Sequence, residues 1–527
     1  MTRTSVVMAA AVVAAIAGTT AGTAARAEWP QWRGPERTGA DPSGPALAEA
    51  WPAGGPPLLW QSEEIPSGGG GGYSSPVVAG GRVYLFVNWR YEVSIDKPVL
   101  KEKALRDLGW SPEALPPDLA AEVEKARTGQ ERAKVTGEQL AAWTDAWIAQ
   151  HVPPEQQKAL GPVVRDRLRR GPSALPLEVL AKLAAVKDKP FEGKDQLQAW
   201  LAANGFAGEA LKDVSKAIPV ATPHANDVVV CLSAADGKTL WKATFPGRPQ
   251  ANNAAATACV AGGRVYAVGS TGGVYCLRAD TGEQVWATQA GSGASNASPV
   301  VADGACVVSI GNLMALDAQT GTILWQQPKV KTGHTSPTIW RAGGTGYVLA
   351  RSGGGLACVG LKTGDLRWTV PCGDGESSPV ASDSTAVVIT NKEETGLLAF
   401  RLTPDGAERL WTFAATVRGV TPVLHENHVY ALAERRAVCL ELRSGKVCWD
   451  EPVANQTWSS PALVDGKLVA ALGRNVEVFR ASPQGLAPLA KASLGLAPCT
   501  SLAVADGRLF LRQSNAVACY DLRPGGK

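Results

Sequence analysis

The sequence predicts an all-β protein: an eight-bladed β-propeller of four-stranded antiparallel blades, with an α-helical insertion in blade 1. Two repeating patterns lead to this prediction. One pattern ends in tryptophan and recurs about every 40 residues, and the other opens a pair of short strands eight times along the chain. The insertion is predicted because both patterns stop for well over one hundred residues after the first pair of strands.

The tryptophan pattern is represented by "GVYCLRADTGEQVW", which ends at Trp286. Its copies end at Trp241, Trp325, Trp368, Trp411 and Trp449, so the spacings are 45, 39, 43, 43 and 38 residues. A period near 40 with short alternating apolar strands is typical of propeller blades. The Asp-Gly and Thr-Gly pairs supply the turn of a tight hairpin. We expect each tryptophan to lie on an outer strand and to cover the gap between neighbouring blades.

The second pattern is represented by "SSPVVAGGRVY", which starts at residue 74. Further copies start at residues 256, 297, 335, 377, 420, 459 and 500. Each reads as two strands joined by a Gly- or Asp-containing turn, with proline tolerated at the first strand residue. The last copy supplies only three strands before the chain nearly ends. We therefore expect "PLLWQ", residues 57–61, to add the fourth strand and close the ring.

The insertion, residues 91–226, holds 19 Lys or Arg and 19 Asp or Glu and lacks the glycine turns of the blades. "TGEQLAAWTDAWIAQH" predicts a helix with Thr136 and Gln139 as a capping box, and with Leu140, Trp143 and Trp147 on one face. "KDQLQAWLAANG" predicts another helix, ended by a glycine. The expected organisation is an N-terminal extension at 28–56, the closing strand and first half of blade 1 at 57–90, the insertion at 91–226, and the remaining propeller at 227–527.

The N-terminus has the pattern of a secretory signal peptide. Arg3 precedes an apolar stretch at residues 6–17, and Ala25-Arg26-Ala27 predicts cleavage before Glu28, so residues 1–27 would be removed. This apolar run is too short to span a bilayer, and no later run is long enough. We expect an exported protein, periplasmic or extracellular. The net charge of +4 over 527 residues, with no basic block, argues against a nucleic-acid partner.

The ten cysteines do not indicate a disulfide framework. Five occupy the same third-strand position in different blades, where they are too far apart to pair, and we expect them to be small buried side chains: Cys231, Cys276, Cys358, Cys439 and Cys519. No C-x-x-C spacing occurs, and the five histidines form no catalytic set. "HENH", residues 425–428, is expected to be a hairpin turn.

The "ALDAxTGxxxW"-like repeats resemble the PQQ-binding-like, or quinoprotein-type, β-propeller family from about residue 57 to the end, apart from the insertion. "WPQWRGPERTG", residues 29–39, resembles the opening of secreted bacterial members. The family includes quinone-dependent dehydrogenases and a non-catalytic propeller subunit of the outer-membrane barrel-assembly machinery. The fold therefore does not choose the function.

Aligning the blades on Ser/Thr-Pro places one residue per blade at the funnel mouth: Tyr73, Ala255, Asn296, His334, Glu376, Gly419, Trp458 and Cys499. Asn253 and Arg418 are expected close by. The resemblance implies a PQQ and calcium site here, with Glu376 and Asn296 on the cation, Arg418 on the quinone oxygens, Trp458 on the rings and His334 beside them. The adjacent cysteine pair common in the dehydrogenases is absent from the sequence, and no motif identifies a general base, so no catalytic residue is predicted.

The five glycines at 68–72 precede a strand rather than a helix, so a phosphate-binding loop is not expected. We expect them to leave the rim bare and mobile beside the insertion, with both on the face of the Ser/Thr-Pro units. The leading hypothesis is a non-catalytic exported propeller that binds a protein or cell-envelope partner. The alternative is a PQQ-dependent oxidoreductase of the alcohol or sugar dehydrogenase type. A third hypothesis is carbohydrate binding by Trp458 and Tyr73.

Overall fold

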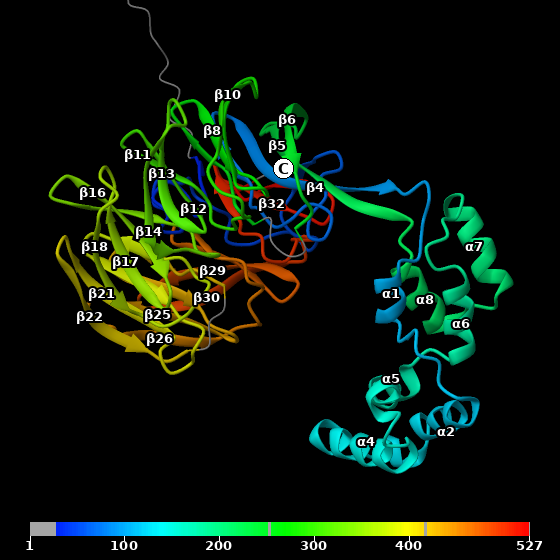
Figure 1. The fold of residues 1–527 in the computed structure, drawn as a ribbon. Helices are drawn as coiled ribbons and strands as arrows, with labels where there is room; N and C mark the ends of the chain where they lie inside the picture. The colour runs from blue at the N-terminus through cyan, green and yellow to red at the C-terminus, as the bar shows by residue number, and fades with distance from the viewer. Residues whose placement is uncertain (1–27, 251–254, 416–418, 526–527) are drawn as a thin grey trace, which may run out of the picture. The chain divides into compact units, whose positions relative to one another are not determined.

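The computed structural model describes residues 28–250, 255–415 and 419–525 (Figure 1). The predicted signal peptide, residues 1–27, lies outside this range. The chain divides into two compact units: one runs up to Arg90 and resumes at Ala225, and the other comprises Tyr91–His224.

The first unit contains eight sheets, each built on the four-stranded antiparallel meander of a propeller blade, which confirms the predicted fold class. Blades 1 to 4 consist of β3 Val77–Ala79, β4 Arg82–Ser94, β5 Ala221–Ser233, β6 Thr239–Gly247; β7 Cys259–Ala261, β8 Arg264–Val268, β9 Gly273–Arg278, β10 Gln284–Gln289; β11 Val300–Ala302, β12 Ala305–Ile310, β13 Asn312–Asp317, β14 Ile323–Lys331; β15 Thr338–Ala342, β16 Thr345–Ser352, β17 Gly355–Gly360 and β18 Leu366–Pro371.

Blades 5 to 8 continue the meander around the ring. They consist of β19 Val380–Ser382, β20 Thr385–Ile389, β21 Leu397–Thr403, β22 Gly406–Phe413; β23 Val423–His425, β24 His428–Leu432, β25 Arg436–Glu441, β26 Val447–Pro452; β27 Ala462–Val464, β28 Lys467–Leu472, β29 Asn475–Ser482, β30 Gly485–Ala492; and β31 Ala503–Ala505, β32 Arg508–Arg512, β33 Val517–Asp521 with β2 Leu58–Gln61.

Blade 8 is completed by a strand from the start of the chain. β2 runs antiparallel to β33, with Trp60 opposite Cys519. Strands from both ends of the chain therefore share one sheet, which leaves no blade with a missing outer strand. Blade 7 departs from the four-stranded pattern, because β1 (Ala40–Asp41) pairs in parallel with β27 as a fifth strand.

The repeated tryptophans join neighbouring blades. Each lies on a fourth strand, and its indole N–H donates to a backbone carbonyl of the next blade: Trp60 to Ala234, Trp241 to Ala279, Trp286 to Ala318, Trp325 to Leu361, Trp368 to Thr403, Trp411 to Leu442 and Trp449 to Ser482. Several of these rings also lie directly on the turn glycine of the next blade. The tryptophan of one blade thus packs against the turn of the next blade, and the two features of the repeat form one contact between blades.

The core lies between adjacent sheets. Between blades 3 and 4, for example, Val307, Leu313, Val348 and Val359 are fully buried in one apolar cluster. The five equivalent third-strand cysteines are buried free thiols, as expected. "HENH" is the predicted hairpin turn, with Glu426 and Asn427 both at positive φ.

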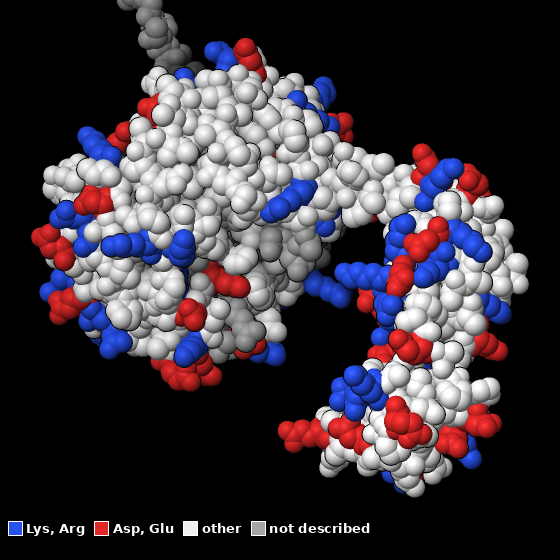
Figure 2. Space-filling view, viewed as in Figure 1, with Lys and Arg blue, Asp and Glu red and all other residues white. Residues whose placement is uncertain are grey.

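The second unit is helical. It contains α1 Glu102–Asp107, α2 Pro117–Arg127, α3 Gln130–Ala133, α4 Gly137–His151, α5 Gln157–Arg170, α6 Leu177–Ala185, α7 Gly193–Ala203 and α8 Gly208–Ala217. One apolar cluster joins α2, α4 and α5 around Trp147 and Val164, and a second joins α1, α6, α7 and α8 around Leu183. Positive and negative side chains are intermixed on its visible surface, more closely than on the propeller (Figure 2).

Two local expectations about this unit are wrong. Thr136 is the N-cap of α4, but its side chain makes no capping hydrogen bond, and Gly137 enters the helix with a left-handed φ of +54° instead of the helical geometry that a capping box requires. The second strand of blade 1 does not end before the expected start of the insertion at residue 91, because β4 continues to Ser94 beside an equally long β5.

Candidate functional site

A segment before the first blade crosses the propeller axis. We call residues 29–41 the axial segment. Its backbone bonds to first strands of four blades: Trp29 to Val78 in blade 1, Pro30 to Val260 in blade 2, Thr38 to Leu424 in blade 6 and Gly39 to Leu463 in blade 7. Blades 2 and 6 stand opposite each other in a ring of eight, so the segment must pass across the centre.

Two arginines anchor the axial segment. Arg33 Nη1 donates to the Thr421 carbonyl at 2.9 Å, and Arg37 Nη1 donates to the Pro299 carbonyl at 2.8 Å. Both side chains are buried, and within the described residues neither forms an ion pair with a carboxylate. Burial lowers the pKa of Arg33 to about 9, with a further contribution from the charge of Arg37, and burial lowers that of Arg37 to about 10. Both guanidinium groups therefore stay positive at neutral pH.

A cavity of about 460 Å³, which we call the axial cup, is lined by residues from all eight blades and from the axial segment. Trp32 is the contribution of the axial segment. The wall is a tier of hydroxyl residues: Ser75, Ser298, Ser336, Ser378, Thr421, Ser460 and Ser501. The rim consists of the eight residues that blade alignment placed at the funnel mouth: Tyr73, Ala255, Asn296, His334, Glu376, Gly419, Trp458 and Cys499.

The wall hydroxyls belong to a belt of hydrogen bonds that runs from blade to blade. In each bond a backbone N–H donates to the hydroxyl of the following blade: Ser75 to Thr257, Thr257 to Ser298, Ser298 to Ser336, Ser336 to Ser378, Thr421 to Ser460, Ser460 to Ser501 and Ser501 to Ser75. These bonds span 2.8–3.2 Å. The junction from Ser378 to Thr421 lacks such a bond among the described contacts, and the buried Thr421 hydroxyl has no partner there.

The cup brings together four of the five residues predicted for a cofactor. Asn296 Nδ2 and His334 Nδ1 lie 2.6 Å apart, so these two are in direct contact. Trp458 is 45% exposed, has a φ of +63° and packs over Gly419. Glu376 is exposed on the rim.

The remaining predicted residue, Arg418, lies outside the described residues, as does Asn253. Over the parts of the chain that the structure describes, no group of three or more His, Cys, Asp or Glu side chains is placed to hold a metal ion. The assignment of Glu376 and Asn296 to a cation therefore rests on their residue types and their shared cavity.

The sequence suggested that the glycine run leaves a bare arc of the rim, but the structure shows a buried side chain beside it. Arg512 of blade 8 is fully buried there and donates to the carbonyls of Pro66, Gly71 and Ser74 at 2.7–3.0 Å. A side chain at Gly71 would collide with Pro66 and crowd the Arg512 guanidinium. The loop needs glycine because its backbone encloses an arginine.

Sequence reasoning missed Trp32, the hydroxyl belt and Arg512. The belt had a detectable signal, because each of the eight blade-opening units carries Ser or Thr at the belt position. Trp32 had none, because the axial segment is not part of any repeat.

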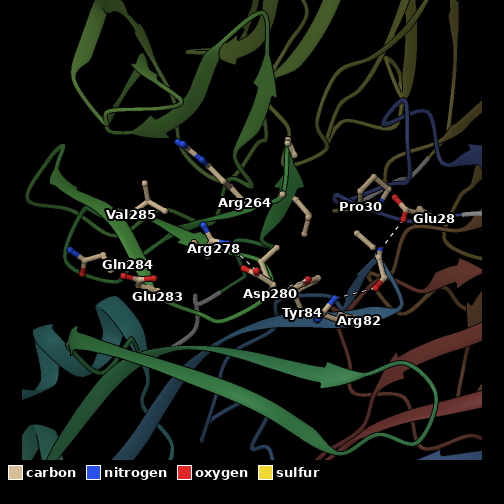
Figure 3. A pocket seen from close by; sticks show the side chains of 17 residues that line it. Glu28, Pro30, Arg82, Tyr84, Arg264, Arg278, Asp280, Glu283, Gln284 and Val285 are labelled. Carbon is tan, nitrogen blue, oxygen red and sulfur yellow. Dashed lines mark hydrogen bonds and ion pairs between the residues drawn. The ribbon is translucent and has the colours of Figure 1, made fainter.

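A larger cavity of about 920 Å³ lies between blades 1 and 2 (Figure 3). Its charged groups engage their own neighbours: Arg278 pairs with Asp280 at 3.0 Å, and Glu28 accepts the Gly80 N–H at 2.8 Å. Val285 at its margin is exposed, and this links the cavity to an apolar surface on the outer strands.

That surface covers four consecutive outer strands, β2, β6, β10 and β14. We call it the apolar arc; its exposed members are Leu58, Leu59, Leu240, Val285, Ile323 and Leu324. Four of them stand immediately before the repeated tryptophan. In blade 4 the same position is Arg367, which pairs with Asp365 and Asp405. The fold therefore accepts a charge at this position, and the aliphatic residues of the arc are not required for the blade.

The comparisons with known proteins agree with this architecture. The family model described as outer membrane protein assembly factor BamB matches residues 225–412. The curated protein of that name from Burkholderia pseudomallei is 29% identical over 226 residues, 37% of this chain and 55% of the relative. Its counterpart from Yersinia pestis is 26% identical over 226 residues, 37% of this chain and 56% of the relative. The chain thus spans a little more than half the length of these relatives.

Two solved structures illustrate the range of similar proteins. BamB from Moraxella catarrhalis is 16% identical, with a TM-score of 0.46 over 57% of this chain and 90% of that one. Quinohemoprotein alcohol dehydrogenase from Comamonas testosteroni is 12% identical, with a TM-score of 0.43 over 59% of this chain and 74% of that one.

The fold and the axial cup define a closed eight-bladed β-propeller with a central cavity. Blades within residues 225–412 match the family model, so the repeats of this propeller are similar to PQQ-like propeller repeats. Within the described ranges, no helix has the length and apolar character needed to cross a membrane.

Proposed function

We propose that this chain is a non-catalytic exported β-propeller that binds a protein partner of the cell envelope. The observation that carries the proposal is the apolar arc, whose aliphatic side chains are 37–53% exposed on four adjacent edge strands. Exposed apolar groups on strand edges favour association with another protein. The arginine at the same position of blade 4 argues against a purely structural reason for them.

Two further observations support this function. The similar curated proteins are named as assembly factors of the outer membrane. Export is proposed from the signal-peptide pattern at residues 1–27, which places the protein in the periplasm or outside the cell.

The test replaces part of the arc without disturbing a blade. The double variant Leu240→Arg with Leu324→Arg is compared with Val447→Arg, which alters a similarly exposed aliphatic residue in blade 6. Proteins crosslinked to each variant in the source cells would be identified by mass spectrometry. A specific envelope protein should be lost from the double variant and retained by Val447→Arg. Equal crosslinking of all forms would contradict the arc as the binding surface.

The second candidate function is a PQQ-dependent oxidoreductase, favoured by one observation: Asn296, His334, Glu376 and Trp458 line the same cavity. Glu376 and Asn296 would hold calcium and Trp458 would face the quinone rings, which supply the redox chemistry when bound. The contact between Asn296 Nδ2 and His334 Nδ1 must break before the Asn296 amide and the His334 ring can turn toward calcium or the quinone.

Calorimetry with PQQ and calcium, followed by dye reduction with alcohols and sugars, separates the two functions. Micromolar binding with turnover would overturn the non-catalytic function. Lack of binding would remove the oxidoreductase.

A further inference from the structure

The axial cup has a wall of hydrogen-bond donors. Seven of the eight belt hydroxyls accept one backbone N–H, Thr421 being the exception, and among the described contacts none of the eight donates its own proton. The preceding serine of the same motif behaves differently, since Ser377 Oγ donates to the Val420 carbonyl at 2.7 Å. The repeat therefore fixes one hydroxyl per blade as a donor, and seven of these line the cup.

The most direct sign of a missing ligand is Thr421. Its side chain is 1% exposed, lines the cup and has no partner for Oγ1 among the described residues. A buried polar atom without a partner is costly and calls for an explanation. An acceptor atom in the cup would supply that partner.

Positive charge lies next to Trp32. The guanidinium carbons of Arg33 and Arg37 are 5.9 and 5.7 Å from the centre of the Trp32 ring. In the described structure their partners are neutral: backbone carbonyls and, for Arg37, the Gln31 side-chain amide oxygen. The one acid in the cup lining, Glu376, is on the exposed rim, where water screens it.

We propose that the axial cup binds a small ligand through an oxyanion, a carboxylate or phosphate group that enters the ring of hydroxyls above Trp32. An anion is favoured over a cation in the ring because most hydroxyls have one lone pair taken by a backbone N–H and a proton still free to donate, and because the nearby charges of Arg33 and Arg37 are positive. Trp458 and Tyr73 on the rim can pack against a ring-shaped body attached to the oxyanion. This inference goes beyond the proposed function and does not depend on a protein partner.

The test uses the purified protein in calcium-free buffer, titrated separately with inorganic phosphate and with glucuronate by calorimetry and tryptophan fluorescence. At least one probe should bind with a dissociation constant below about 1 mM. Phosphate binding alone identifies a simple oxyanion site, and tighter glucuronate binding identifies a site that also holds the sugar ring. Lack of binding of either probe overturns the proposal.

Three variants make the test specific. Thr421→Val should weaken binding about tenfold, the effect of losing one hydrogen bond to a charged group. Ser309→Ala is the matched control, because this hydroxyl is also buried without a described partner but lies in β12, outside the cup. Unchanged affinity in Thr421→Val overturns the proposal, provided that its unfolding midpoint is at least as high as that of the unmodified protein, since loss of an unpartnered buried hydroxyl should not destabilise the fold.

Glu376→Gln distinguishes oxyanion binding from the second candidate function, because the two predict opposite changes in ligand affinity. Removal of this negative charge should tighten oxyanion binding, whereas it should weaken a PQQ and calcium complex that uses the carboxylate. Weaker oxyanion binding in Glu376→Gln would contradict the charge argument for the cup.

Discussion

The contact between a turn glycine and the tryptophan of the preceding blade can be tested with a single methyl group. In the structure, Gly364 has a φ of +72°, and a Cβ there would lie 2.5 Å from Cγ of Trp325. Trp325 is 8% exposed and donates to the Leu361 carbonyl at 2.8 Å. Gly364→Ala must therefore either displace the indole or distort the turn.

The magnitude follows from two costs. A left-handed backbone costs a residue with a Cβ about 1 kcal/mol or more. Overpacking a filled contact costs about 1–3 kcal/mol, and loss of the indole hydrogen bond adds about 1 kcal/mol. We expect Gly364→Ala to lower the free energy of unfolding by about 2–5 kcal/mol.

Gly406→Ala in blade 5 is the matched control, because its Cβ would have no heavy atom within 4 Å and its φ is outside the left-handed region. It should change stability by less than about 0.5 kcal/mol. Urea unfolding of both variants, followed by circular dichroism and with slopes compared, measures the difference. A wild-type midpoint for Gly364→Ala, or an equal loss in Gly406→Ala, would refute the interblade packing argument.

Three further predictions concern other parts of the molecule. Burial opposes ionisation of Glu124, but hydrogen bonds from Arg127 and Arg167 outweigh it and lower the pKa of this carboxyl. These ion pairs should therefore stabilise the helical unit above the unfolded pKa of about 4.3, and the stabilisation should be lost as pH falls through the lower folded pKa. Glu124→Gln should cost about 3 kcal/mol at pH 7, with a smaller difference in acid, while Glu209→Gln on an exposed pair should have no measurable effect in thermal unfolding. A thiol reagent should modify exposed Cys499 first, half-buried Cys448 more slowly and the buried thiols last, because the reagent must reach the sulfur. Burial also raises the pKa of Cys231 and Cys358 to about 12, so mass spectrometry showing early modification of Cys231 would contradict the fold. Replacing residues 91–224 by a short turn should leave a cooperatively unfolding propeller, since this segment forms a compact unit of its own, and loss of the cooperative transition would show that the helical unit is needed for folding.

The repeat explains why so much of the fold could be predicted. Turn glycines, tryptophans and Ser/Thr-Pro units recur in register, so a misreading of one blade is corrected by the others. The same register placed the eight rim residues, from Tyr73 to Cys499, at one cavity. The capping box at Thr136 was wrong because a local motif in the non-repeating insertion has no such internal check.

The blade, the ring closure by residues 57–61 and the rim residues could be predicted because each depends on a periodic or local sequence pattern. The residues that fill the centre could not be predicted in this way. Trp32, Arg33 and Arg37 reach the axis through contacts with blades up to 428 residues away, and Arg512 occupies the glycine loop from 441 residues away. Such contacts are set by where a closed ring brings the chain ends, and neither period nor propensity records that geometry.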